Sequence, residues 1–443
     1  FLRQLRHVLT SAIGLHRFPA FCAVLVGGAT LLQRPIGELV VKTRLVPTKN
    51  IRKIATFLAA LFAASVSFAL INGGKIPTSR PSATNATTSD SKIQDGLGIS
   101  TSTLPPELLA GRSIDLTLFA LVRALDVLFS SPSSSSSLKR RSSRPTIPWT
   151  TIFFTLSSAT IMHAWFYSPS RLPRTYNSWI SRAAQLDTRI PEALRRCRLG
   201  EWEYGRETDQ ADLLGPVCEE EGIPYESGDP AKTIPVNCEI VNRRRCTCEK
   251  HALLRFLQGW CFAALMYFPL HFLVLAKRLY SLRHFPSGRL RAGITDTVRT
   301  IIAASRSSSF LGAFIALVYY GVCLGRTRIG PGLLAALTRM RSMALRRVVA
   351  QMLDSGLAVT LGCFLCGLSI LVEEPKRRVE IMLFVAPRAV GAWIPRRYHR
   401  KYLWREHLGF AISTAVVFTA VHEKSGRVRG VLGRVLGDVL KQS

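Results

Sequence analysis

Apolar residues fall into runs of about 17–25 residues, and Ser-rich, Pro-rich or charged segments separate these runs. A helix of about 20 apolar residues crosses the roughly 30 Å hydrocarbon core of a bilayer. The run "IATFLAALFAASVSFALI" at 54–71 is the cleanest example. The pattern predicts an all-α, multi-pass membrane protein with spans at 18–32, 54–71, 113–129, 148–168, 308–324, 357–372, 379–394 and 407–422.

A further apolar segment at 252–276 is long enough to span, but Arg255, Pro269 and His271 interrupt it. A spanning helix and an interfacial or re-entrant helix both fit this segment.

Residues 332–353 form a basic amphipathic stretch in which Arg339, Arg346 and Arg347 alternate with apolar residues at helical spacing. This pattern is typical of a helix on the membrane surface. We expect these arginines to contact lipid phosphates.

The hydrophilic segments differ in kind. The first 17 residues are basic and amphipathic; a mitochondrial presequence and a juxtamembrane helix both fit, and the apolar run that follows directly favours the second. The loops at 73–111 and 130–147 are rich in Ser, Thr, Pro and Gly and predict disorder. Residues 169–251 form a hydrophilic insert with many acids and five cysteines, and residues 424–443 a basic tail.

The segments "LFALVRALDVL" (118–128) and "LFVAPRAVGAW" (383–393) resemble one another, with Arg123 opposite Arg388. Four runs match four runs in the same order, and small residues recur at shared positions, as in closely packed membrane helices. The sequence therefore predicts a duplicated four-transmembrane-helix unit, 18–168 and 308–423, with about eight to nine membrane helices in all. Both halves would share one orientation. The matched positions include Gly28 with Gly321, Ala63 with Gly367, Ser65 with Ser369 and Phe154 with Phe410.

The repeat also matches charges within predicted spans, since Glu380 falls opposite Asp115 as Arg388 does opposite Arg123. Ionisable residues inside spans usually face a bundle interior or a water-filled path. The acid and arginine of each span are about two turns apart, so each partner must come from another helix, a lipid phosphate or water. Snorkelling of the arginines to the interface is the alternative.

The chain carries 59 Lys and Arg against 28 Asp and Glu, a net charge of +31, at a mean hydropathy of +0.19. No nucleic-acid-binding module accompanies this charge, so nucleic acid is not an expected partner. Basic loops beside membrane helices fit it best, with anionic head groups of the bilayer as the partner. Association with itself or with other membrane proteins is also expected.

The cysteines of the insert leave three readings open. Cys238, Cys246, Cys248 and His251 form a weak candidate zinc site, since their spacing lacks the paired ligands typical of zinc. Disulfides would fit an oxidising compartment, and plain thiols are the third reading. No Gly-rich phosphate loop, H-E-x-x-H or nucleophile elbow is present, so neither catalytic residues nor a cofactor are expected. "VEEPKRR" at 372–378 predicts a solvated turn between spans.

Three segments resemble the transmembrane protein 135 family of eukaryotes: "CTCEKHALLRFLQGW", "SSFLGAFIALVYYGV" and "LGCFLCGLSILVEEPKRRVEIMLFVAPRAVGAW". The resemblance covers most of the chain from Pro148 onward, and "FYSPSRLPRTYNSWI" is similar to a segment of fungal-type members. The last region is in turn similar to the superfamily of mitochondrial inner-membrane import channels and small peroxisomal membrane proteins.

The resemblance implies a mitochondrial or peroxisomal membrane and a non-enzymatic role in organelle dynamics, membrane organisation or lipid homeostasis. Two alternatives remain: a transporter or pore for an anion, metabolite or lipid, and a subunit or scaffold of a protein-import translocase.

Overall fold

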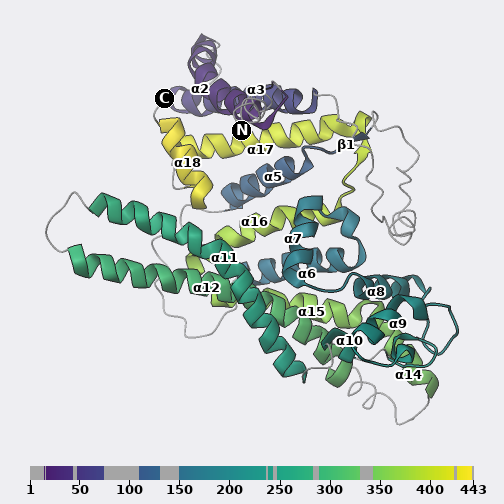
Figure 1. Cartoon of the computed structure of the whole chain (residues 1–443). Helices are drawn as coiled ribbons and strands as arrows, with labels where there is room; N and C mark the ends of the chain where they lie inside the picture. The colour runs from purple at the N-terminus through teal and green to yellow at the C-terminus, as the bar shows by residue number, and fades with distance from the viewer. Residues whose placement is uncertain are drawn as a thin grey trace, which may run out of the picture. The chain divides into compact units, whose positions relative to one another are not determined.

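The chain is almost entirely helical, which confirms the expected all-α class (Figure 1). The computed structural model describes residues 14, 16–42, 47–73, 109–129, 149–235, 238–242, 247–282, 289–329, 343–423 and 427–441. Most of the N-terminal segment, both predicted disordered loops, Arg339 and Cys246 lie outside these residues. The described residues form two compact units, one of 14–129 with 383–441 and one of 149–382.

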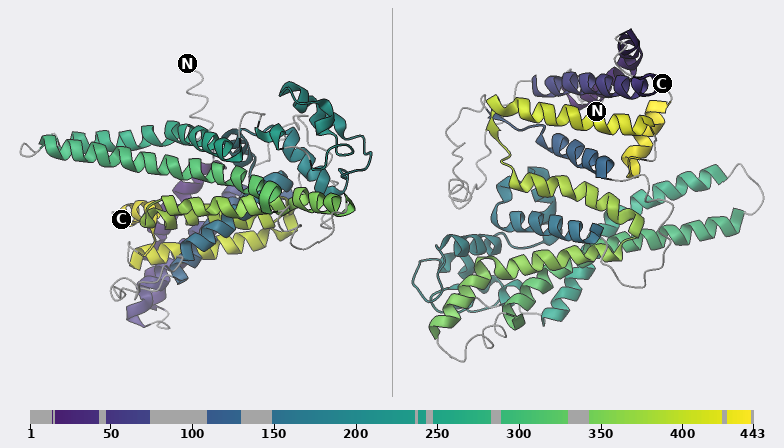
Figure 2. Two further views of the ribbon diagram at one scale, coloured as in Figure 1. Left: turned by 90° about the horizontal axis from the view of Figure 1, so that it is seen from below. Right: turned by 180° about the vertical axis from the view of Figure 1, so that it is seen from behind.

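The first unit is a layer of long helices, each packed on the next (Figures 1 and 2). α2 packs on α3, α3 on α17, and α17 on α5. The C-terminal half of α16 also belongs to this unit, as does α18, which lies in the predicted basic tail. The bounds are α2 Phe18–Lys42, α3 Thr48–Gly73, α5 Ile114–Phe129, α16 Pro375–Trp393, α17 Leu403–Glu423 and α18 Gly430–Lys441.

Alanines let the helices of this unit approach closely. Ala59, Ala60, Ala63 and Ala64 of α3 are at most 1 % exposed, and a Cβ at Gly28 of α2 would lie only 3.1 Å from the Ala63 methyl. Small residues at contacts are the usual means of packing helices where lipid removes the hydrophobic driving force. The opposite face of α3 exposes apolar side chains one turn apart, at Leu58, Phe62 and Val66.

A two-stranded antiparallel pairing, β1 (Leu109–Ala110) with β2 (Tyr398–His399), ties the start of α5 to the connection between α16 and α17. Gly111 follows β1 with a φ of +119°, and a Cβ there would lie 2.1 Å from the Arg396 carbonyl oxygen. Only glycine fits this backbone conformation and this approach.

The second unit joins a helical bundle to the hydrophilic insert. α15 packs on α12 and α6, and α11 packs along α12 as an antiparallel hairpin (Figure 1). Its helices are α6 Trp149–Tyr167, α7 Arg174–Ala184, α8 Arg189–Leu199, α9 Ala211–Glu220, α10 Glu239–Asn242, α11 Cys248–Leu282, α12 Arg289–Leu324, α14 Met343–Met352 and α15 Ala358–Gly367. Shorter helical turns are η3 Pro169–Arg171, η4 Tyr225–Gly228, η5 Gly325–Ile329, η6 Leu353–Leu357 and η7 Leu368–Val372, with η8 Arg400–Tyr402 in the first unit.

Glycines bring the backbones of this bundle together. A Cβ at Gly362 of α15 would lie 2.6 Å from the Val318 carbonyl oxygen of α12, and one at Gly321 would lie 2.6 Å from the Gly362 Cα. α11 meets α12 in the same way, at Gly259 and Gly312. Larger side chains at these positions would force the helices apart.

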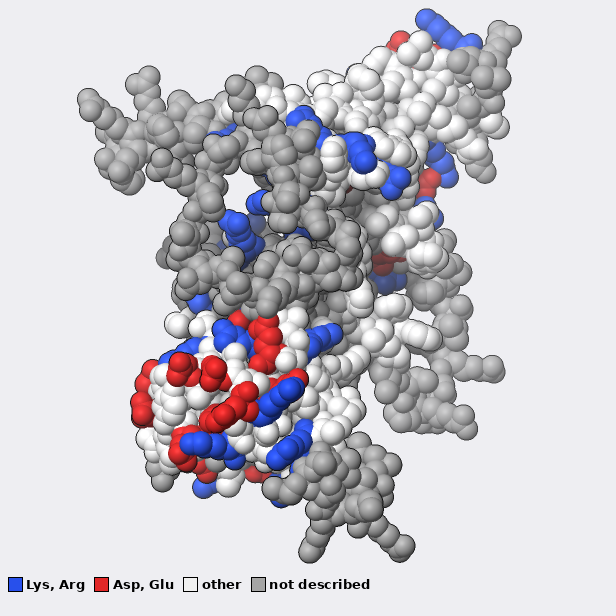
Figure 3. Space-filling view, turned by 90° about the vertical axis from the view of Figure 1, so that its right-hand side faces the viewer, with Lys and Arg blue, Asp and Glu red and all other residues white. Residues whose placement is uncertain are grey.

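The insert has its own core. Trp202, Cys218 and Cys197 are at most 3 % exposed and pack with Leu214 and Val217 of α9. Charged side chains of both signs gather on the face of the insert, which holds half of the chain's acidic residues (Figure 3). α14 completes this core through Ala350.

Five helices of the described residues are long and apolar enough to cross a membrane: Phe18–Lys42, Asn50–Gly73, Cys248–Lys277, Ile294–Ile329 and Arg346–Val372. Many large apolar side chains on them are exposed, an arrangement that bulk lipid stabilises and water does not. These features indicate a membrane protein. α5, α6, α16 and α17 are shorter, more polar or more charged, so the five fall below the expected eight to nine. The apolar segment at 252–276 lies within one continuous helix of 35 residues, α11, which contains one of these five candidate spans.

Candidate functional site

Arg123 and Arg388, paired by the sequence comparison, share one local contact but differ in burial. Each guanidinium stacks over the phenylalanine one helical turn earlier, at 5.3 Å from the Phe119 ring and 3.9 Å from the Phe384 ring. Arg123 is 7 % exposed and donates to the Arg429 carbonyl at 3.1 Å. Arg388, partly exposed, donates to the carbonyl of Phe384 at 2.6 Å. Both charges are thus engaged by the protein itself.

The two matched acids differ. Asp115 accepts two hydrogen bonds of 2.7 Å from Arg396, so its partner comes from another segment, as the spacing requires. Glu380 is partly exposed on α16.

The three described candidate zinc ligands, Cys238, Cys248 and His251, do not form a metal-binding group. Cys248 forms a disulfide with Cys323 across the α11–α12 hairpin. His251 is buried against Arg255 and Tyr319, and Cys238 lies beside α10, partly buried. No group of three or more His, Cys, Asp or Glu that could hold a metal occurs in the described part of the chain.

α14 presents two faces. Arg346 and Arg347 are exposed, as a surface helix requires. The other face packs on the insert, where the Gln351 amide donates to the Trp202 carbonyl at 2.8 Å and the Cys197 carbonyl at 3.1 Å. This helix therefore also anchors the insert.

The insert contacts a buried ion pair of the helical bundle through Tyr204. The Nε of Arg326 lies 2.8 Å from Asp354 Oδ1, both side chains are nearly fully buried, and the Tyr204 hydroxyl donates to the same carboxylate. Arg326 lies in the π-helical turn η5 and Asp354 in the π-helical turn η6, and such turns often occur at functional sites. The pair lines a cavity of about 40 Å³, which admits water but not a metabolite.

Beside this pair, α8 covers the C-terminal end of α6. Arg195 donates to the carbonyls of Phe166 at 2.6 Å and Trp165 at 3.4 Å, and Arg198 donates to His163 at 2.9 Å. Cations at a helix C-terminus satisfy its unpaired carbonyls. Burial raises the pKa of the neighbouring Cys197 thiol to about 12, which makes it an inert packing group.

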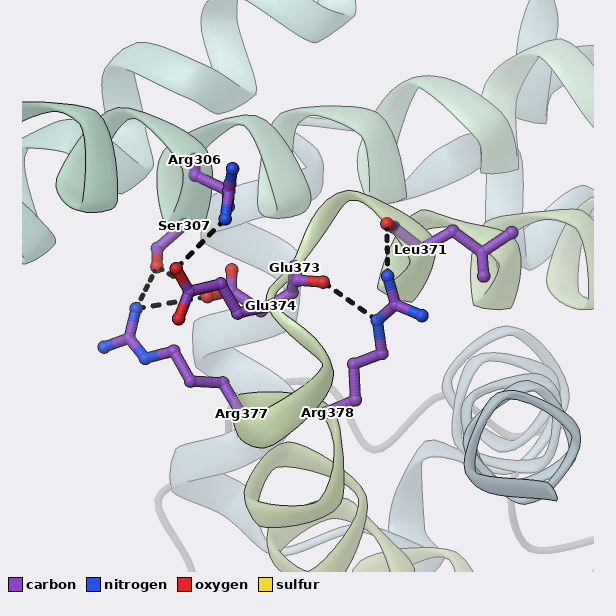
Figure 4. A network of polar contacts seen from close by, with 7 residues as sticks. All are labelled: Arg306, Ser307, Leu371, Glu373, Glu374, Arg377 and Arg378. Atoms are coloured by element: carbon purple, nitrogen blue, oxygen red, sulfur yellow. Dashed lines mark hydrogen bonds and ion pairs between the residues drawn. The ribbon is translucent and has the colours of Figure 1, made fainter. Parts of the chain in front are cut away.

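A second polar network lies at the other end of the α12–α15 pair (Figure 4). The side chain of Glu373 is 1 % exposed and accepts hydrogen bonds from Arg377 at 3.1 Å and Ser307 at 3.3 Å. Arg378 donates to the carbonyls of Glu373 and Leu371. The expected solvated turn is therefore wrong for Glu373, whereas its neighbour Glu374 is exposed.

The spacing of these two networks is informative. Ser307 and Arg326 are about 19 residues apart along α12 and η5, and so are Asp354 and Glu373 along the neighbouring chain segment. A helix of this length spans ~28 Å, close to the hydrocarbon thickness of a bilayer. The buried charges thus bracket the apolar part of the helix pair.

The first unit has polar contacts at a comparable spacing on other helices, although Lys53 in one of them is 54 % exposed. At one end of α17, Glu406 accepts from Ser113 at 2.5 Å and from the Tyr398 hydroxyl. At the other end, Glu423 pairs with Lys53 of α3 at 2.6 Å. The two glutamates are about 17 residues apart, or ~26 Å.

Sequence reasoning missed Asp354, Glu373 and Glu406. Asp354 had a usable signal, because it is a single acid beside a long apolar run. Glu373 and Glu406 stand among several charges, and their partners are distant in sequence. No protein-family model, curated protein or solved structure matches this chain.

Proposed function

We propose that the chain is a membrane protein built from two copies of a four-helix unit that have exchanged their fourth helices. The order of packing carries this proposal. In the first unit α2 packs on α3 and α3 on α17; in the second α12 packs on α15 and α15 on α6. In the sequence repeat α2 corresponds to α12, α3 to α15 and α6 to α17. The fourth helix of each repeat thus packs on the second helix of the other.

Burial along the fourth helices supports the same correspondence. In both, the buried positions follow one pattern and the exposed position Leu156 corresponds to Ile412. The matched buried pairs are Phe154 with Phe410, Ser158 with Thr414, Ala159 with Ala415, Ile161 with Val417, Met162 with Phe418 and Ala164 with Ala420.

The second helices match in one register. Six successive pairs of buried positions coincide when Ala63 is set opposite Gly362, rather than opposite Gly367 as the sequence comparison has it. These pairs are Ala59 with Ala358, Ala60 with Val359, Ala63 with Gly362, Ala64 with Cys363, Ser67 with Cys366 and Phe68 with Gly367. In this register the close approach of Gly28 to Ala63 corresponds to that of Gly321 to Gly362. Eight to nine spans would follow, with α5, α6, α16 and α17 as further spans.

The role we infer is non-enzymatic: organisation of a mitochondrial or peroxisomal membrane, in organelle dynamics or lipid homeostasis. The buried charges support a structural role for both units, because Arg123, Asp354 and Glu373 are each held by other groups of the protein. The choice of organelle rests on the family resemblance.

Localisation of the tagged full-length protein against mitochondrial and peroxisomal markers tests this role, together with organelle shape and lipid composition after deletion. We expect the protein in one of these membranes, resistant to carbonate extraction, with altered organelle lipid or morphology in its absence. Flux of an anion through liposomes that requires both Arg123 and Arg388 would replace this role with transport.

A further inference from the structure

Residues 393–405 comprise the last residue of α16, the connection that follows and the first three residues of α17, and they carry the densest basic sequence of the first unit, "WIPRRYHRKYLWR". Arg397, Arg400, Lys401 and Arg405 are all exposed. Within the described residues, no carboxylate lies at ion-pair distance from these four side chains. We call this segment the basic corner.

The basic corner is held in place by its other residues. Tyr398 and His399 pair with β1, and His399 Nδ1 accepts from the Lys401 backbone amide at 3.1 Å. The two nearby acids are occupied within the protein, Asp115 by Arg396 and Glu406 by Ser113 and Tyr398. Burial, and the hydrogen bond to Glu406, raise the pKa of the Tyr398 phenol, so it stays a donor. The segment therefore presents its cations on a fixed backbone.

Large aromatic side chains accompany the cations. Trp393, Tyr402 and Trp404 are 74 %, 40 % and 57 % exposed. The Arg405 guanidinium lies 4.9 Å from the Tyr402 ring and 5.6 Å from the Trp404 ring. Exposed tryptophan and tyrosine beside Arg and Lys are typical of the membrane–water interface, where the ring meets the acyl boundary and the charge meets the head groups.

The position along α17 agrees with this environment. The basic corner ends at the Glu406 network, from which the apolar part of α17 runs ~26 Å to the Glu423–Lys53 pair. It therefore lies where one face of the bilayer would meet the first unit.

We propose that the basic corner binds the head-group phosphates of anionic phospholipids at one face of the membrane. This inference rests on the proposed membrane role and adds to it a lipid partner and a site. The exposed cations lie in the same short segment as the exposed indole rings of Trp393 and Trp404, which suits lipid phosphates at the level of the cations and acyl chains beside the rings.

Quenching of tryptophan emission by brominated lipid tests it, with the full-length protein in phosphatidylcholine vesicles containing a minor fraction of phosphatidylglycerol. Bromine is placed on either lipid in turn, and the difference from W393F/W404F isolates the local signal. The test variant is R397Q/R400Q/K401Q/R405Q. The control, K277Q/R299Q/K376Q/R434Q, removes the same charge from dispersed exposed positions.

In the unsubstituted protein we expect brominated phosphatidylglycerol to quench the emission of Trp393 and Trp404 more strongly than brominated phosphatidylcholine does. In the test variant this preference should fall at least about fivefold, which corresponds to the loss of about one surface cation. The control should keep the preference. Equal falls in both variants, or no preference in the unsubstituted protein, would overturn the site. Displacement of the lipid by inorganic phosphate at constant ionic strength would also overturn it, in favour of a soluble anion. Release by carbonate would refute the membrane role itself, a separate outcome.

Discussion

Glu373 and Glu374 are neighbours in sequence, yet they differ in how much they should stabilise the fold. Glu373 is buried with Ser307 and Arg377, whereas Glu374 and its partner Arg306 are both exposed. We expect E373A to lower the free energy of unfolding by about 1–2 kcal/mol, less than a fully buried pair because Arg377 can regain water. E374A should cost under about 0.5 kcal/mol. Unfolding of both variants in lipid nanodiscs measures the difference, and equal losses would mean that the Glu373 network does not hold α12 to α15.

Cys197 should be unreactive at neutral and mildly alkaline pH. Burial raises its pKa to about 12, so at pH 8 the native protein holds about a thousandfold less thiolate at this site than the unfolded chain. Because the native pKa lies above the unfolded one, the thiol's contribution to stability is complete below about pH 8.5 and is lost as the pH rises toward 12. Iodoacetamide modification followed by mass spectrometry should find Cys197 unmodified in the native state and fully modified in denaturant. Modification at equal rates in the two states would contradict its burial.

Single residues also show what sequence can foresee. Arg123 was identifiable because a charge inside an apolar run is conspicuous and its matched position in the repeat carries the same charge. Its hydrogen-bond acceptor, the Arg429 carbonyl, was not identifiable, because this carbonyl lies more than 300 residues away and only folding brings it near. The same holds for Tyr204 and Asp354, which belong to the insert and to the bundle.

At the scale of elements, α14 illustrates a helix whose pattern predicts only half of its packing. Its basic face is exposed as the amphipathic spacing indicates, but its other face joins the insert through Gln351 rather than through apolar residues alone. Q351A removes hydrogen bonds to two buried carbonyls, and we expect a loss of about 2–4 kcal/mol in the docking of the insert. Faster hydrogen exchange and proteolysis around 200–210 would report it.

R346A, on the exposed face of the same helix, is the matched control and should leave this exchange unchanged. If the two substitutions had equal effects, α14 would not anchor the insert.

The length of a helix was predictable from the sequence only where the helix begins and ends together with its apolar run. A helix lies on every predicted run, but α12 begins at Arg289, well before the run at 308. Its first half contains the charged residues Asp296, Arg299 and Arg306, which hydropathy excludes from a span, and this half packs along α11. The partners of each helix could not be read from the sequence, because the repeat predicts which helices are alike and not which copy each one joins.

The proposed exchange of fourth helices makes a prediction about the whole molecule. In a plain tandem duplication, residues up to 168 would fold as one unit and the later residues as another. Here α6 belongs to the second unit and α17 to the first. A fragment of residues 137–395 contains every described helix of the second unit, whereas 169–395 differs only by lacking α6.

We therefore expect 137–395 to purify from membranes as a monodisperse, protease-resistant protein, and 169–395 to aggregate or be degraded. Loss of α6 removes the helix that packs against Gly367 and the Tyr167 hydroxyl that donates to the Asp354 carbonyl. It also exposes the small-residue face of α15 to lipid. Co-expression of residues 1–168 with 169–443 should restore stability, because each fragment then supplies the fourth helix that the other lacks. Stability of 169–395 equal to that of 137–395 would refute the exchange and leave a simple tandem arrangement.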